Sequence, residues 1–144
     1  MDRVDRITEL FIFDIYIAIL KIEKIVSEFD SAQDLLHDFR SWDSVIREFE
    51  IIGEASKYLL KAKLLDPGHR QVVDFRNKIT HEYFGIDAEE IWDISFHDLS
   101  EYKKIVLERL NEIEPSLRCQ LAKTFQRDNH YLDFVVEALE ELMA

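Results

Sequence analysis

The first part of the chain carries an apolar pattern with helical spacing on more than one side. Between residues 4 and 29, apolar side chains recur at the three-and-four spacing of one helical face: Val4, Ile7, Phe11, Ile15, Ala18, Ile22, Ile25 and Phe29. A second apolar stripe lies beside the first and consists of Leu10, Phe13, Ile17 and Leu20. A surface helix needs only one apolar face, so this pattern predicts a helix that is buried on two sides. A central place in a helical bundle or contact with a second subunit would each account for it.

A second long helix is predicted for residues 32–63, with Asp30 or Ser31 as its N-cap. The small residues Gly53 and Ala55 lie in its middle, where another helix could approach closely. Its apolar side chains follow one face and are expected in the core: Leu35, Phe39, Trp42, Ile46, Phe49, Ile52 and Leu59.

Turn residues at 66–69 separate this helix from a third one, predicted for residues 71–84 and ended by Gly85. Asp87 is a possible N-cap for a short helix that follows. Asp98 or Ser100 is then expected to open a helix that reaches about residue 113.

Pro115 breaks the chain, and two shorter amphipathic helices are predicted after it, at 115–125 and 130–143. No segment shows a convincing strand pattern. The fold class is therefore expected to be all-α, an up-and-down helical bundle over residues 1–114. Residues 115–144 are expected to form a C-terminal helical extension packed on the same domain.

The composition agrees with one helical domain. The chain has 144 residues, of which 47% are hydrophobic and 33% are charged, and it has only three glycines and two prolines. Cys119 is the single cysteine, which excludes a disulfide within the chain and a zinc site built from several cysteines. The apolar run at residues 10–20 is too short to span a bilayer and is interrupted by Asp14. We therefore expect a cytoplasmic protein with no membrane partner and no signal peptide.

The formal net charge of −12 opposes non-specific binding to nucleic acid, because phosphate groups repel it. A function on RNA would need a local basic pocket or a basic partner. Lys78, Arg47 and Lys57 are candidates for such RNA contacts, although each also fits an ordinary solvated face.

One short segment, RNKITHEY at residues 76–83, gathers most of the candidate chemistry: Arg76, Asn77, Lys78, His81 and Tyr83. Histidine titrates near neutral pH and can move a proton, and arginine binds phosphate oxygens with two donors. Together they suit cleavage of RNA by its own 2′-hydroxyl, with an asparagine orienting either group. The same residues could instead cap the end of a helix and pack in the core, and spacing alone does not separate these alternatives.

Metal-dependent chemistry is the competing interpretation. His81 with Glu82, or His97 with Asp98, could supply ligands, but neither pair has the i, i+4 spacing of a helical zinc site. The chain also lacks a phosphate-binding glycine motif. We therefore expect no metal and no cofactor.

Several segments resemble the HEPN superfamily, in its HepT-like toxin branch. RNKITHEY matches the branch's R-x4-H-x-Y signature, and FEIIGEASK at residues 49–57 is similar to its second helix. The segment at residues 81–94 and the opening of the chain fit as well, so the likeness covers about residues 2–113.

This resemblance implies a helical bundle that forms a homodimer, with both motifs lining one cleft. It implies a metal-independent ribonuclease that is the toxin of a type VII toxin–antitoxin pair, with Arg76 and His81 catalytic and Asn77 assisting. It also implies a minimal nucleotidyltransferase as antitoxin, which transfers AMP to Tyr83. A related HEPN branch instead provides a non-catalytic, substrate-binding subunit to nucleotidyltransferases, and the motif does not distinguish the two.

Overall fold

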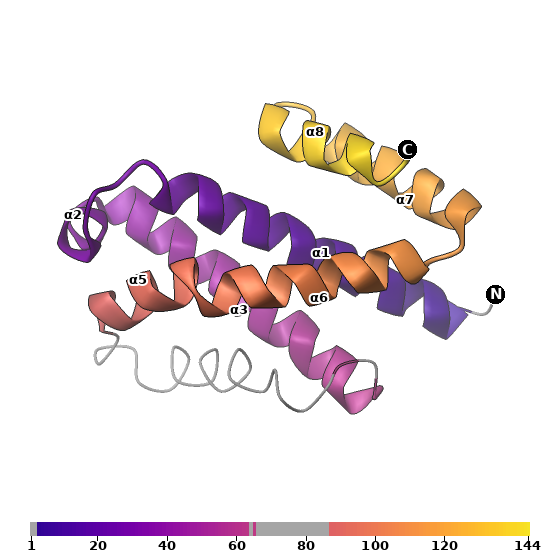
Figure 1. The fold of residues 1–144 in the computed structure, drawn as a ribbon, viewed down its shortest axis with the longest axis horizontal. Helices are drawn as coiled ribbons and strands as arrows, with labels where there is room; N and C mark the ends of the chain where they lie inside the picture. The colour runs from indigo at the N-terminus through magenta and orange to yellow at the C-terminus, as the bar shows by residue number, and fades with distance from the viewer. Residues whose placement is uncertain (1–2, 64, 66–86) are drawn as a thin grey trace.

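The computed structural model describes residues 3–63, 65 and 87–144 of the chain, and this part is α-helical without strands (Figure 1). The expected all-α fold class is thereby confirmed. The helices are α1 (Arg3–Val26), α2 (Ala32–Leu36), α3 (Phe39–Lys61), α5 (Ala88–Phe96), α6 (Asp98–Glu112), α7 (Pro115–Asp128) and α8 (Asp133–Glu141). Each described helix is too short or too polar to cross a lipid bilayer.

Helix α1 lies at the centre of the bundle. Helices α3 and α6 pack along it, and α7 and α8 lie along another of its sides (Figure 1). Ile15 and Ile22 of the first apolar stripe are buried, and so are Phe13, Ile17 and Leu20 of the second. One chain therefore buries both stripes over this part of α1, as a central helix in a bundle would.

The second stripe of α1 is covered by α7 and α8, which we call the C-terminal helix pair. The ring of Phe13 is fully buried and stacks on the ring of Phe125 from α7, with 5.1 Å between the ring centroids and 5° between the planes. Stacked aromatic rings bury a large apolar area at this contact. The C-terminal helix pair thus forms part of the core and covers this side of α1.

The C-terminal helix pair is held to the end of α6 by Arg118. Its Nη1 donates to the carbonyl oxygens of Ile113 at 2.9 Å and Asn111 at 3.1 Å, and its Nε donates to the carbonyl oxygen of Leu142 at 2.9 Å. A guanidinium is a favourable partner for carbonyls at helix C-termini, where the last carbonyl groups have no partner within the helix. One side chain therefore ties together the ends of α6 and α8.

The single helix expected for residues 32–63 is wrong, because the chain breaks before Phe39. Ser31 caps the short α2 by accepting from the backbone N–H of Asp34 at 3.1 Å. Asp38 has extended backbone angles, and its Oδ1 accepts from the N–H of Ser41 at 3.1 Å. The side-chain bond of Asp38 stabilises the start of α3. It therefore competes with a continuation of α2 through this position.

The expected core position of Phe39 is also wrong, since its side chain is 69% exposed. Phe39 is the first residue of α3, and the guanidinium of Arg40 lies 5.7 Å from its ring centroid. The remaining apolar residues of that stripe are buried or partly buried.

Helices α5 and α7 begin at residues that are typical of helix N-termini. Asp87 caps α5, as expected, by accepting from the N–H of Glu89 at 2.9 Å. Pro115 is the first residue of α7, and the carboxylate of Glu114 accepts from the N–H groups of Ser116 and Leu117. These bonds lower the pKa of Glu114. Proline thus starts α7 here, since its missing N–H is not needed in a first turn.

Candidate functional site

The predicted catalytic segment lies outside the described residues. Arg76, Asn77, Lys78, His81 and Tyr83 all fall between residue 65 and Asp87, so their predicted roles stay predictions. Before this segment, the described residues end just after α3. After it, they begin again at the start of α5. Helices α3 and α5 therefore flank the segment in the sequence, and α6 follows α5 directly.

A buried polar contact joins two of these elements. The hydroxyl oxygens of Ser56 on α3 and Tyr102 on α6 lie 2.5 Å apart, and both side chains are buried. Burial raises the pKa of Tyr102 to about 12, although its hydrogen bond with Ser56 acts in the opposite direction. Tyr102 therefore keeps its proton at neutral pH, and we assign this pair a role in fixing α3 against α6 rather than in proton transfer.

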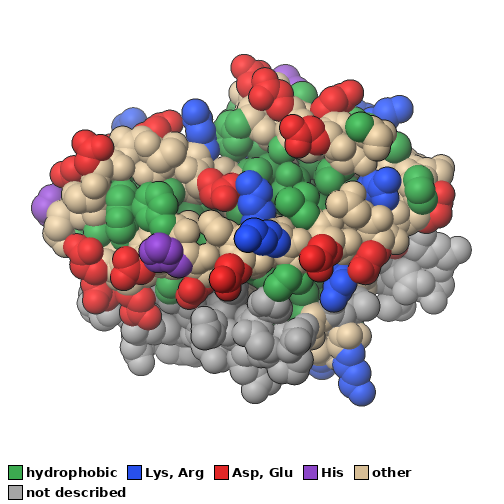
Figure 2. Space-filling model, viewed as in Figure 1, with side chains coloured by type: hydrophobic (Ala, Val, Ile, Leu, Met, Phe, Trp, Pro, Cys, Tyr) green, Lys and Arg blue, Asp and Glu red, His purple; other side chains and the backbone are tan. Residues whose placement is uncertain are grey.

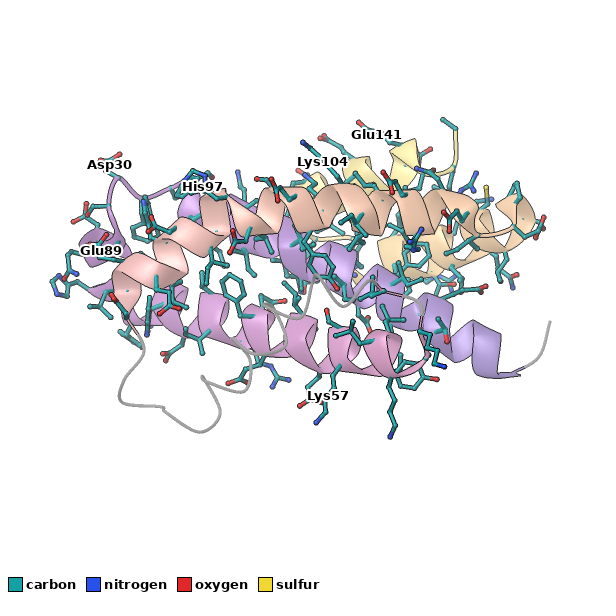
Figure 3. The ribbon with its side chains drawn as sticks, turned by 60° about the horizontal axis from the view of Figure 1, so that its bottom comes forward. Asp30, Lys57, Glu89, His97, Lys104 and Glu141 are labelled. Carbon is teal, nitrogen blue, oxygen red and sulfur yellow. The ribbon has the colours of Figure 1, made fainter. Side chains whose placement is uncertain are left out.

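Arg47 and Lys57, the two RNA-contact candidates within the described chain, are both exposed on α3. Ten residues separate them, which is about 15 Å along a helix axis. Lys57 points away from the bundle (Figure 3), and the exposed face of α3 also carries Asp43 and Glu54. The structure therefore places them apart on a face of mixed charge, and does not join them in one basic patch.

Acidic side chains dominate one end of the described surface. Figure 2 shows Asp and Glu gathered where α2 and α5 meet, and Figure 3 places Asp30 and Glu89 at that end. Contacts between α2 and α5 bring these two stretches of sequence together. The negative charge at this end of the molecule would repel RNA.

His97 and Asp98 are the metal-ligand candidates that lie within the described residues. His97 lies exposed at the junction of α5 and α6. Within residues 3–63 and 87–144, no three side chains of His, Cys, Asp and Glu converge in a way that could hold a metal ion. The pair of His97 and Asp98 therefore gains no third ligand from the described residues.

The chain matches a family model over most of its length. Residues 15–109, about two thirds of the chain, match the family model described as "Ribonuclease HepT-like". The matched span includes the whole of the RNKITHEY segment and ends within α6, before the C-terminal helix pair.

Curated relatives carry ribonuclease names. "Probable ribonuclease HepT" of Thermococcus cleftensis is 36% identical over 96 residues, which is 65% of this chain and 86% of that protein. "Putative RNase MJ1380" of Methanocaldococcus jannaschii is 41% identical over 66 residues, which is 44% of this chain and 61% of that protein. "Putative RNase MJ0127" of the same organism is 34% identical over 91 residues, or 58% of this chain and 75% of that protein. No solved structure gave a significant match.

Proposed function

The chain belongs to the HepT-like ribonuclease family, and on this premise we propose that it is a metal-independent endoribonuclease whose catalytic groups are Arg76 and His81. The observation that carries the proposal is the R-x4-H-x-Y arrangement at residues 76–83, which lies inside the span matched by the family. The ribonuclease names of the relatives support the same activity.

The proposed reaction uses the substrate's own 2′-hydroxyl as nucleophile. This oxygen attacks the adjacent phosphorus, the bond to the 5′-oxygen of the next nucleotide breaks, and a cyclic phosphate and a free 5′-hydroxyl result. His81 takes the proton from the 2′-hydroxyl or delivers one to the leaving oxygen, because an unperturbed imidazole exchanges protons near neutral pH. Arg76 stabilises the charge that builds on the phosphoryl oxygens, and Asn77 orients one of these groups.

The proposed active unit is a homodimer. One imidazole cannot serve as base on one side of the phosphorus and as acid on the other side in the same step. Two copies related by a two-fold axis supply two histidines to one shared cleft. Lys78 is proposed to contact the RNA backbone near the same cleft.

The proposed biological role is that of the toxin in a type VII toxin–antitoxin pair. Its antitoxin is a minimal nucleotidyltransferase that transfers AMP from ATP to the hydroxyl of Tyr83, with release of pyrophosphate. The added phosphate would occupy or repel the position of the RNA phosphate.

A non-catalytic role is the second candidate. The net charge of −12, together with the separation of Arg47 and Lys57 on α3, favours a protein that assists a nucleotidyltransferase instead of binding RNA itself. Such a subunit would bind the nucleotidyltransferase stably and would not cleave RNA.

The deciding experiment compares purified wild type with Arg76→Ala and His81→Ala on single-stranded RNA, with and without a chelator. We expect each variant to lose ~10²–10⁴ in cleavage rate while keeping its helical circular dichroism, and the chelator to have no effect. His97→Ala and Arg127→Ala are matched controls, since both side chains are exposed in the described structure. Cleavage that survives His81→Ala, or that stops with chelator, would refute the proposed chemistry, and a wild type without cleavage would favour the second candidate.

A further inference from the structure

Three lysines gather at the C-terminal end of α3. Lys57, Lys61 and Lys63 are the charged residues of the stretch 55–63, which contains no aspartate or glutamate. The whole chain has 18 lysines and arginines against 30 aspartates and glutamates, so this stretch reverses the average charge of the protein. All three lysines are exposed, and Lys57 points away from the bundle (Figure 3). The end of α3 is therefore a positively charged stretch in an acidic chain.

Core contacts hold the other side of this helix end. Leu59 is buried, and the ring of Tyr58 packs against an aromatic ring of α1. Lys57 and Lys61 are four residues apart, so they lie on one face of the helix, about 6 Å apart along its axis. Lys63 follows directly after the last turn of α3. We call Lys57, Lys61 and Lys63 the α3 lysine patch.

The backbone at Lys63 departs from the conformation that a lysine favours. Its φ angle of 62° lies in the left-handed region, which glycine usually occupies just after a helix. A residue with a Cβ atom is less stable there than glycine. Departures from a local structural rule concentrate at functional sites, so a lysine at this position favours a role for its side chain.

The charge along α3 changes sign from one end of the helix to the other. Helix α3 starts at Phe39 beside α2, at the acidic end where Figure 3 places Asp30 and Glu89. Glu54, one turn before the patch, is the last acidic residue of α3. Lys61 lies about 33 Å along the helix axis from Phe39. A polyanion would therefore be repelled at the start of α3 and attracted at its end.

We propose that the α3 lysine patch binds the phosphate backbone of single-stranded RNA, with each lysine contacting one phosphate. The inference rests on the proposed ribonuclease activity and gives this acidic chain a place at which to hold its substrate. Lysine contacts phosphate as a point charge and reads no base, so the patch contributes affinity that does not depend on RNA sequence. The patch has no part in the chemistry of cleavage.

The test measures RNA binding separately from RNA cleavage. The probe is a labelled single-stranded RNA whose 2′-hydroxyls are methylated, because the proposed reaction cannot cleave it. Fluorescence anisotropy gives the dissociation constant at several salt concentrations. Each lost phosphate contact should weaken binding about 5-fold at ~0.1 M salt, and should reduce the slope of log K against log salt by about 0.7. The triple variant Lys57→Gln, Lys61→Gln, Lys63→Gln should therefore bind about 100-fold more weakly, with a slope reduced by about 2.

The matched control removes three lysines from exposed positions on α1, α6 and α7, as Lys24→Gln, Lys104→Gln, Lys123→Gln. It has the same net charge as the patch variant and should keep the wild-type slope. Equal weakening of both triple variants would show an effect of net charge and would refute the patch. A wild type that cleaves RNA, with a patch variant that binds the probe equally tightly, would refute the patch and leave the ribonuclease proposal standing. A wild type that neither binds the probe nor cleaves unmodified RNA would refute both.

Lys63→Gly separates RNA binding from a structural role at the helix end. Glycine suits the left-handed conformation, so this variant should resist unfolding better than wild type while it binds the probe about 5-fold more weakly. A lysine that only compensates the carbonyl groups at a helix C-terminus would affect stability and leave RNA binding unchanged. Unchanged affinity of Lys63→Gly would therefore refute the phosphate contact assigned to Lys63.

Discussion

The hydroxyl oxygens of Ser56 and Tyr102 meet at 2.5 Å inside the bundle, 46 residues apart in the sequence. This contact is a polar link between α3 and α6, and Tyr102 belongs to the buried core of the bundle. It fixes one register of α6 against α3, because a slip of either helix would leave a buried hydroxyl without this partner.

Tyr102 makes the fold sensitive to alkaline pH. Its pKa is about 12 in the folded chain and about 10 when unfolded, so the native state holds this proton more tightly. Its contribution to stability is complete below pH 10 and is lost as the pH rises from 10 to 12, a loss of roughly 2 kcal/mol. Urea unfolding at several pH values should show a shallower alkaline loss for Tyr102→Phe than for wild type. Tyr131→Phe, at a position 68% exposed, should follow wild type, and equal alkaline slopes for all three proteins would contradict this assignment.

Removing the ring of Phe125 should loosen the C-terminal helix pair. Phe125→Ala deletes the partner on which the fully buried Phe13 stacks, and we expect a loss of about 2–4 kcal/mol in the free energy of unfolding. Tyr131 lies in the turn between α7 and α8 and is largely exposed, so Tyr131→Ala should cost less than about 0.5 kcal/mol. Chemical denaturation measures both, and similar losses would show that the stack is not a core contact.

We expect both alanine and lysine at position 118 to destabilise the fold. Arg118→Ala removes donors from three carbonyl oxygens at the ends of α6 and α8, with an expected cost of about 1–3 kcal/mol. Arg118→Lys should recover little of this, because one ammonium group cannot reach all three carbonyls as the guanidinium does. Thermal unfolding provides the measurement, with Arg127→Ala as the exposed control from the same helix. If Arg118→Lys were as stable as wild type, the positive charge alone would account for the contribution of Arg118 to stability.

A glycine should stabilise the end of α3. Lys63 has a φ angle of 62°, in the left-handed region, and its N–H donates to the carbonyl oxygen of Leu60 at 3.0 Å. Lys63→Gly removes the steric cost of this conformation, so we expect a gain of about 0.5–1 kcal/mol. Lys61→Gly, still within the helix, should instead lose a similar amount. A shift of the unfolding midpoint in the same direction for both substitutions would contradict this prediction.

We predict that modification of Tyr83 controls the ribonuclease activity. A phenol with a pKa of about 10 is a poor general acid near neutrality, so we assign Tyr83 a regulatory role. With a minimal nucleotidyltransferase and ATP, the intact mass should rise by one or more AMP units located on Tyr83, with loss of ribonuclease activity. Tyr83→Phe should keep at least part of its activity and escape this neutralisation, whereas Tyr131→Phe should still be modified. A mass shift that maps elsewhere would remove AMP transfer to Tyr83 from the proposal.

The sequence predicted the helices well where local signals and apolar spacing agreed. The spacing around Ile15 and Ile22 predicted a buried α1, and the side chain of Asp87 caps α5 as expected. The break at Asp38 was missed, because its cap bond to Ser41 is decided by a few dihedral angles that apolar spacing does not report.

What buries the second stripe of α1 could not be decided from its pattern. A ring such as Phe13 has the same spacing whether it meets Phe125 of its own chain or a side chain of another subunit. The candidate site was likewise predicted from the R-x4-H-x-Y segment and the family likeness, and its residues fall outside the described part of the chain. The positions of Arg47 and Lys57 were known in sequence, but their separation on α3 needed the fold.

The stack between Phe13 and Phe125 also sets an order of events during synthesis. The two residues are 112 positions apart, so at ribosomal speeds of ~5–20 residues per second Phe13 waits roughly 6–20 s for its partner to be made. During that interval the ring of Phe13 lacks the cover that Phe125 of α7 later provides. The nascent protein therefore passes through a stage in which this apolar side of α1 is open to chaperones and to premature association, and the synthesis of α7 and α8 ends that stage.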